Sequence, residues 1–189
     1  AFLISRGLSK VVIGRDARHG SAEFMQESTE ILSGAGLDVY LLPRELPTPV
    51  LAFAVNEMKM DCGIMVTASH NPATDNGYKV YLGGNLDGVE YRGSQIIAPI
   101  DKEISKLISK VALPSPRGLS WKIVGEEVIN SYVSSCVSGS VEATPQKIVY
   151  TAMHGVGTQT LLSVFQAANF SKPILEEKQC EPDPDFPTV

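Results

Sequence analysis

Three residue types that suit phosphoryl transfer occur close together near the middle of this sequence. Ser69 and His70 are adjacent, and Lys79 follows the serine by ten residues. A serine hydroxyl can accept and donate a phosphoryl group, and an imidazole or an amine can take up or deliver the proton that such a transfer moves. The segment from Ser69 to Lys79, called the serine loop below, is therefore a candidate phosphoryl-transfer site.

The residues on either side of the serine loop predict two strands that would position it. Residues 62–66 are apolar and partly β-branched, which is typical of a strand buried on both faces of a parallel sheet. A loop that leaves such a strand lies outside the carboxyl ends of the sheet, where α/β folds bind ligands. Asn71-Pro72 and Asn76-Gly77 are turn dipeptides, so the chain should return as an antiparallel strand over 78–82. Ser69 and Lys79 could then meet across the loop.

The first part of the chain alternates between strand and helix patterns. Strands are predicted over 10–13 and 39–42, and helices over 21–33 and 49–58. This order implies right-handed crossovers and a parallel sheet. Apolar residues at helical spacing predict a third helix that starts near Pro99 and covers one sheet face. The predicted fold class is α/β, a three-layer αβα domain with a mixed, mostly parallel sheet.

A second α/β unit is predicted to start near the C-terminal end of this chain. An amphipathic helix over 126–137 is followed by a strand over 147–150 and a helix over 158–169. One strand and one helix are too little for an independent core. We therefore expect one domain over 1–142 and the incomplete beginning of a second α/β domain over 143–189.

Composition and charge restrict the class of partner. The formal net charge is -5 and no run of basic residues occurs, which argues against nucleic acid or an anionic membrane as the main partner. Small phosphates remain possible. Cys62, Cys136 and Cys180 are far apart in the sequence and form no Cys-x-x-Cys pair, as expected for a protein of a reducing compartment. Because the sequence contains no signal peptide or apolar stretch of membrane length, we expect a cytoplasmic location.

The serine loop, with Ser-His-Asn-Pro followed by Asn-Gly-x-Lys, closely resembles the active-site loop of the α-D-phosphohexomutases. This superfamily includes phosphoglucomutase and phosphomannomutase. Residues 14–18, 47–50 and 150–157 also resemble family segments, and they occur in the expected order. The resemblance therefore extends over nearly the whole chain. The motif Met-His-Gly-Val-Gly at residues 153–157 is more similar to the phosphoglucomutase and phosphopentomutase branch of the superfamily.

The resemblance implies an isomerase that interconverts sugar 1-phosphates and 6-phosphates through a phosphoserine and a bisphosphorylated sugar. Ser69 would carry the phosphoryl group and provide one oxygen ligand to Mg²⁺. Lys79 would act as the general base or acid, and His70 would position the serine loop or assist proton transfer. The implied activator is glucose 1,6-bisphosphate or an equivalent hexose bisphosphate. The implied phosphate-binding residues are Arg18, Arg15 and Asn71.

Members of the resembled family are longer than this chain and have four domains around a central cleft. The resemblance covers the first domain and the opening of the second. The Asp-Gly-Asp-x-Asp-Arg metal loop, the sugar-recognition loop and the phosphate-binding loop of the fourth domain lie outside it. We therefore expect a fragment that is inactive alone. Its expected partners are a small-molecule sugar phosphate and the remaining domains of the same polypeptide.

Other interpretations of these residues remain open. The isolated chain could be a non-catalytic phosphosugar-binding or structural module, and the complete enzyme could prefer a pentose or mannose phosphate. A serine hydrolase is disfavoured because the sequence lacks Gly-x-Ser-x-Gly and because adjacent Ser69 and His70 are poorly placed for one triad.

Structural roles compete with the functional ones at several positions. Ser69 could be an ordinary turn hydroxyl, and Lys79 a solvated strand lysine. Residues 15–18 could form a surface ion network. Gly155-x-Gly157 favours a tight turn over a phosphate site, and His154 is expected to be structural. Asp183 and Asp185 favour a loop over a metal site because prolines flank them.

Overall fold

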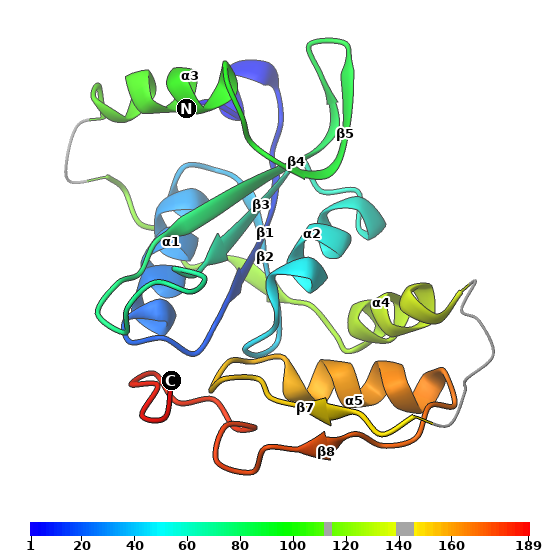
Figure 1. The fold of residues 1–189 in the computed structure, drawn as a ribbon. Helices are drawn as coiled ribbons and strands as arrows, with labels where there is room; N and C mark the ends of the chain where they lie inside the picture. Colours follow the sequence, from blue (N-terminus) through cyan, green and yellow to red (C-terminus); the bar gives the residue numbers. More distant parts are fainter. Residues whose placement is uncertain (112–114, 139–145) are drawn as a thin grey trace.

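A mixed sheet forms the centre of the fold in the computed structural model, which describes residues 1–111, 115–138 and 146–189 (Figure 1). Within these residues the strand order is β5-β4-β3-β1-β2-β6. Strands β3, β1, β2 and β6 are parallel, whereas β4 is antiparallel to both β3 and β5. The strands are β1 (Lys10–Arg15), β2 (Asp38–Leu41), β3 (Cys62–Val66), β4 (Tyr78–Leu86), β5 (Val89–Gln95) and β6 (Trp121–Ile123).

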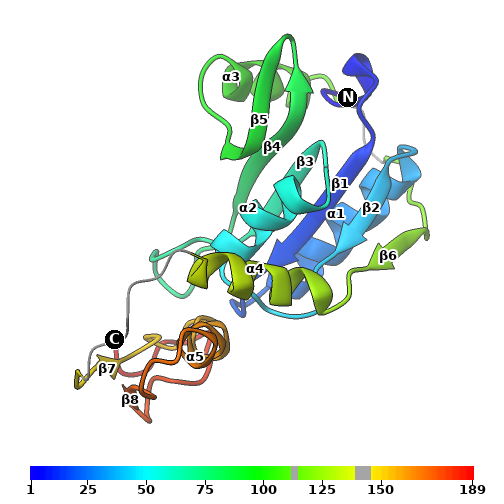
Figure 2. The same cartoon turned by 90° about the vertical axis from the view of Figure 1, so that its right-hand side faces the viewer.

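Helices cover both faces of the sheet and so make three layers (Figures 1 and 2). One face packs against α1 and α3, and the opposite face against α2 and α4. The helices are α1 (Ser21–Gly34), α2 (Thr48–Glu57), α3 (Ile100–Ile108) and α4 (Glu127–Val137), and a short 3₁₀ helix, η1 (Ile4–Arg6), precedes β1.

The apolar run in β1 explains how one short strand serves two cores. Val12 packs in the core that includes α2, whereas Val11 and Ile13 pack in the core on the α1 side. Successive side chains of a strand point to opposite faces, so a central strand between two helix layers has no polar alternation. All three side chains are fully buried.

A smaller α/β unit follows, formed by β7 (Val149–Tyr150), α5 (Thr158–Ala167) and β8 (Ile174–Leu175). Strands β7 and β8 are parallel, and α5 packs against α4. Figure 1 shows this unit below the carboxyl ends of β1 and β3, with the C-terminal segment running toward the serine loop. Among the residues described, no helix has the length and apolar character that crossing a bilayer requires.

The structure confirms the predicted fold class and the elements that carry the serine loop. The β-α-β-α-β order, the antiparallel strand after the loop and the helix that begins beside Pro99 are all present. Helix α3 ends at Ile108, although the apolar spacing continues to Val111. The predicted boundary between residues 142 and 143 lies outside the described residues and stays a prediction.

Two strands of the central sheet, β5 and β6, were not predicted. Most side chains of β5 are exposed, so its sequence lacks the apolar alternation that identifies a half-buried strand. Asp87-Gly88 joins β4 to β5 and is a turn dipeptide typical of hairpins. That dipeptide was the available signal. Strand β6 has three residues, too few for a periodicity to be recognised.

Burial makes Cys62 chemically different from the other cysteines. Burial, with a smaller contribution from the negative charge of Asp61, raises the pKa of the Cys62 thiol to about 12. Cys136 is exposed. At pH 8 we expect iodoacetamide to alkylate Cys136 rapidly and to leave Cys62 unmodified, as measured by peptide mass spectrometry. In denaturant both should react, and rapid alkylation of Cys62 in the folded protein would contradict the prediction.

Candidate active site

Ser69 lies exposed in the loop that follows β3, at the carboxyl end of a central strand. Its backbone adopts the left-handed conformation with φ of 58°, which non-glycine residues adopt at a cost of about 1–2 kcal/mol. The hydroxyl oxygen of Thr67 accepts a hydrogen bond from the Ser69 amide at 3.0 Å, and this bond supports the turn. The hydroxyl group of Ser69 is therefore presented to solvent by a specific loop conformation.

His70 lies next to the serine hydroxyl. Its Nδ1 is 3.3 Å from Ser69 Oγ, within hydrogen-bonding distance. The sequence argued against these adjacent residues as the nucleophile and base of one hydrolase triad, and a contact between the two side chains does not by itself make a triad. A hydrolase triad would require a carboxylate at the second ring nitrogen of His70, and no carboxylate of the described residues contacts that nitrogen. The geometry allows His70 to hold or move a proton at Ser69 Oγ.

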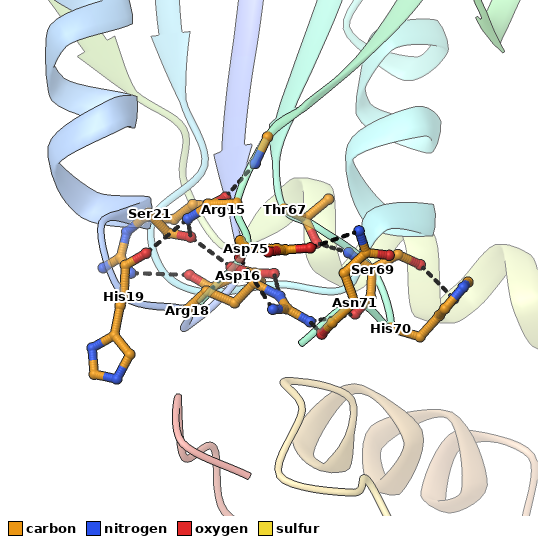
Figure 3. A network of polar contacts seen from close by, with 12 residues as sticks. Arg15, Asp16, Arg18, His19, Ser21, Thr67, Ser69, His70, Asn71 and Asp75 are labelled. Atoms are coloured by element: carbon orange, nitrogen blue, oxygen red, sulfur yellow. Dashed lines mark hydrogen bonds and ion pairs between the residues drawn. The ribbon is translucent and has the colours of Figure 1, made fainter. Parts of the chain in front are cut away.

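Arg18 binds the backbone of the serine loop from inside, as Figure 3 shows. Its Nη1 donates to the carbonyl oxygens of Pro72 at 2.8 Å and Asp75 at 3.2 Å. Its Nη2 donates to the carbonyl oxygens of Ser69 at 3.0 Å and Asn71 at 2.8 Å. The side chain is 3% exposed. Arg18 was expected to meet the phosphate directly, but in this structure its terminal nitrogens hold the loop backbone instead.

Asp16 connects the loop after β1 to this arrangement. One carboxylate oxygen accepts hydrogen bonds from the Arg18 amide at 3.0 Å and from Ser21 Oγ at 2.7 Å. The other oxygen lies 3.4 Å from Arg18 Nε. The side-chain Nδ2 of Asn76 donates to Ser21 Oγ at 2.8 Å and to the His19 carbonyl at 2.9 Å. The segment 16–21 and the serine loop therefore form one hydrogen-bonded unit.

A cavity of about 340 Å³ brings Ser69 and Lys79 together. Their predicted meeting follows from the antiparallel pairing of β3 and β4, in which Lys79 lies opposite Met65. No carboxylate among the described residues forms an ion pair with Lys79. The N-terminal end of α2 also borders the cavity, and such an end favours anions. The other lining residues are Asp16, Ala17, Arg18, Leu46, Pro47, Thr48, Pro49, Met65, Thr67, His154, Gly155, Val156, Asp183, Pro184 and Phe186.

Two of the predicted phosphate-binding residues lie away from this cavity. Arg15 Nη2 forms an ion pair with Glu45 at 2.7 Å, and Arg15 does not line the cavity. Asn71 lines a neighbouring cavity of about 590 Å³, and its side-chain Nδ2 donates to the Asp75 carboxylate at 3.2 Å. The phosphate-binding roles of Arg15 and Asn71 stay predictions. The structure does not place either residue beside both Ser69 and Lys79.

The C-terminal segment contributes contacts that were not predicted from sequence. Phe186 lines both cavities, and its ring centroid lies 4.9 Å from Arg18 Cζ. Asp185 Oδ1 lies 2.7 Å from His19 Nε2, within hydrogen-bonding distance. The prolines that flank Asp183 and Asp185 favoured a loop, but they gave no indication of where this loop would dock. Long-range contacts of this kind depend on the placement of the second unit.

The residues around Gly155 combine a structural role with a position at the site. The Gly155 amide donates to the Ala152 carbonyl at 2.8 Å, so the expected tight turn is present. His154 is buried, and its Nε2 lies 2.8 Å from Thr188 Oγ1, which agrees with a structural role. Both residues nevertheless line the cavity of Ser69.

Comparisons with known proteins agree with this geometry. Residues 2–112 match a family model described as "Phosphoglucomutase/phosphomannomutase, alpha/beta/alpha domain I". Residues 126–189 match the model of alpha/beta/alpha domain II of the same family. The chain belongs to the phosphoglucomutase/phosphomannomutase family. The match to domain II includes α4, so the family models divide the chain before this helix.

Individual family members are similar along almost the whole chain. A "Probable phosphomannomutase" of Haemophilus influenzae is 45% identical over 184 residues, which are 95% of this chain and 37% of that protein. A human phosphopentomutase is 35% identical over 199 residues, with coverage of 95% and 31%. The crystal structure of a phosphoglucomutase/phosphomannomutase family protein from Burkholderia thailandensis has 26% identity and a TM-score of 0.78, and the match covers 99% of this chain and 39% of that one. The chain thus spans about a third of the length of these relatives.

Membership of this family suggests a metal cofactor, which needs oxygen, nitrogen or sulfur ligands from the protein. In residues 1–111, 115–138 and 146–189, no three His, Cys, Asp or Glu side chains form a group that could hold a metal ion. Asp16 is bonded to Arg18 and Ser21, and Asp183 accepts a bond from the Asp185 amide at 3.0 Å. The described residues therefore do not make a complete metal site by themselves.

Proposed function

We propose that the protein containing this chain is a phosphohexomutase that interconverts sugar 1-phosphates and 6-phosphates. The observation that carries this proposal is the exposed Ser69 hydroxyl in one cavity with Lys79, at the carboxyl end of a central strand. Family membership supports the same reaction. Because the chain spans about a third of its relatives, we propose the activity for the full-length enzyme.

The proposed reaction begins with a phosphoryl group on Ser69. The bond between phosphorus and Ser69 Oγ breaks as a sugar hydroxyl bonds to phosphorus, and the hydroxyl proton passes to a base. The sugar is then a bisphosphate. After it turns over in the site, its other phosphoryl group returns to Ser69, and the sugar oxygen that is released recovers a proton. Neither the enzyme nor the sugar gains or loses a phosphoryl group over the whole cycle.

We assign proton transfer with the sugar hydroxyl to Lys79. This lysine lines the cavity of Ser69, and no carboxylate of the described residues neutralises it. Its charge can also stabilise the phosphoryl oxygens during transfer. The proposed role of His70 is to orient Ser69 Oγ, since Nδ1 already lies 3.3 Å from it.

The proposed cofactors are Mg²⁺ and, as activator, glucose 1,6-bisphosphate or an equivalent hexose bisphosphate. A bound divalent cation neutralises charge on a transferring phosphoryl group. In this proposal Ser69 supplies one oxygen, and carboxylates outside the described residues supply the other protein ligands. The relatives are named as phosphomannomutase, phosphoglucomutase and phosphopentomutase, so their names support sugar phosphates as a substrate class and do not select one sugar.

We further propose that the enzyme works in the cytoplasm, where free thiols such as its three cysteines persist.

Phosphate occupancy and turnover can be measured on the same protein. We expect the full-length enzyme, supplied with magnesium and a trace of glucose 1,6-bisphosphate, to convert glucose 1-phosphate or mannose 1-phosphate to the 6-phosphate. Peptide mass spectrometry of that sample should find phosphate on Ser69. Absence of both turnover and phosphate would contradict the proposal.

The isolated chain of 189 residues should show no turnover in the same assay. The reason is that its described residues lack a complete metal site. If the full-length enzyme were also inactive but bound sugar phosphates, the alternative of a non-catalytic phosphosugar-binding module would be favoured.

A further inference from the structure

The guanidinium of Arg18 has no N–H group left for a phosphate. An arginine side chain carries five N–H donors. Four of them bond to the carbonyl oxygens of Ser69, Asn71, Pro72 and Asp75, and Nε faces the Asp16 carboxylate at 3.4 Å. Turning the guanidinium toward a phosphoryl group would break several of these partly buried hydrogen bonds at once, and each lost bond costs free energy.

Four carbonyl oxygens that converge on one cation define the shape of the serine loop. Ser69 itself has a left-handed backbone, and the turn beyond it is closed by bonds from the Asn71 amide to Ala68 and from the Asp75 amide to Pro72. Each bond is 3.0 Å long. Because Arg18 binds the backbone at both ends of this turn, its position constrains the backbone from which the Ser69 side chain projects.

The face of the Arg18 guanidinium is covered by an aromatic ring from the second unit. The ring centroid of Phe186 lies 4.9 Å from Arg18 Cζ, a distance at which a cation is attracted to the π face. Beside it, Asp185 pairs with His19, the residue that follows Arg18. In Figure 3 His19 points from the domain toward the C-terminal segment. The second unit therefore contacts the serine loop through Arg18 and its neighbour.

From these contacts we infer that Arg18 is a positioning residue, and that Phe186 holds it in place and couples the second unit to the geometry of Ser69. Arg18 acts on the reaction through the loop backbone and does not touch the sugar phosphate. Phe186 acts one step further away. Displacement of the second unit removes the aromatic cover and loosens the serine loop. The consequence for turnover rests on the proposed function, whereas the consequence for loop structure does not.

Replacement of Phe186 tests the structural part of this inference by hydrogen–deuterium exchange of the serine loop. In the substrate-free full-length enzyme, Phe186→Leu should speed exchange in the peptide with the Asn71 and Asp75 amides about 5- to 10-fold, because local opening becomes easier. Phe186→Tyr keeps an aromatic face and should exchange as the wild type does. The matched control is Phe170→Leu, because Phe170 packs on Phe165 within the second unit, with ring centroids 5.5 Å apart. It should leave exchange in the loop unchanged.

A double variant tests whether Phe186 acts through Arg18. Lysine has at most three N–H donors, so Arg18→Lys cannot reproduce the four carbonyl bonds and should itself loosen the loop. Adding Phe186→Leu to Arg18→Lys should then produce little further change, because the two residues share one interaction. Additive effects on exchange would overturn the coupling.

The kinetic part is tested in the same variants. Phe186→Leu should lower kcat about tenfold and change KM for the sugar phosphate less than about twofold, because the reacting hydroxyl is misplaced while the sugar contacts persist. Phe186→Tyr, which keeps the aromatic ring, should have the kcat of the wild type. The inference is overturned if the serine loop of Phe186→Leu exchanges at the wild-type rate or if Phe170→Leu speeds loop exchange equally. It is also overturned if Phe186→Tyr shows the same faster exchange and lower kcat as Phe186→Leu. Absence of phosphate on Ser69 would instead contradict the proposed function and would leave the exchange measurements to decide the role of Arg18.

Discussion

Ser69→Ala in the full-length enzyme should abolish mutase turnover, with a loss in kcat of at least about 10⁴-fold, as removal of a nucleophile does in other enzymes. The physical reason is that alanine has no oxygen to carry the phosphoryl group between the two sugar positions. The measurement is conversion of glucose 1-phosphate to glucose 6-phosphate in the presence of magnesium and glucose 1,6-bisphosphate. Peptide mass spectrometry should find no phosphate in the serine-loop peptide of the variant.

A second serine-to-alanine replacement provides the matched control for this experiment. Ser134 is exposed on α4, away from the serine loop, so Ser134→Ala should keep wild-type turnover and the phosphate on Ser69. Folding of the Ser69 variant can be checked by its circular dichroism spectrum. Wild-type turnover in a correctly folded Ser69→Ala enzyme would refute the phosphoserine mechanism.

Gly93→Ala should destabilise the chain by at least about 3 kcal/mol, because two penalties combine at this position. Gly93 has φ of 81°, in the left-handed region that favours glycine. An added Cβ would also overlap the carbonyl oxygen of Ala52 in α2. Strand β5 packs against α2 at this point, so the clash can be relieved only by moving a strand or a helix. Urea unfolding of the 189-residue chain, followed by the fluorescence of Trp121, its single tryptophan, measures the loss.

Gly88→Ala separates the two penalties. Gly88 has φ of 85°, close to that of Gly93, but no atom lies within 4 Å of an added Cβ. We therefore expect a loss of only about 1 kcal/mol, the backbone penalty alone. Equal losses in the two variants would show that the contact between β5 and α2 is not close-packed.

The sequence by itself was sufficient to predict the layers of the fold and the position of the serine loop. Strands buried on both faces are apolar at every position, and α2 begins with a proline in its first turn, so these elements are encoded locally. The proximity of Ser69 and Lys79 was predictable because β3 and β4 are joined by one short loop with recognisable turn residues. Strand β5 was missed because its mostly exposed residues carry little periodic signal.

Only the tertiary structure decided which partner each charged group has. Arg15 and Arg18 are three residues apart and were both expected to face a phosphate, yet one pairs with Glu45 and the other binds four carbonyl oxygens of the serine loop. The contact of Phe186 with Arg18 joins residues 168 positions apart in the sequence. Helices and strands follow from periodicities over a few residues, whereas the partner of a long cationic side chain depends on where distant backbone segments meet in space.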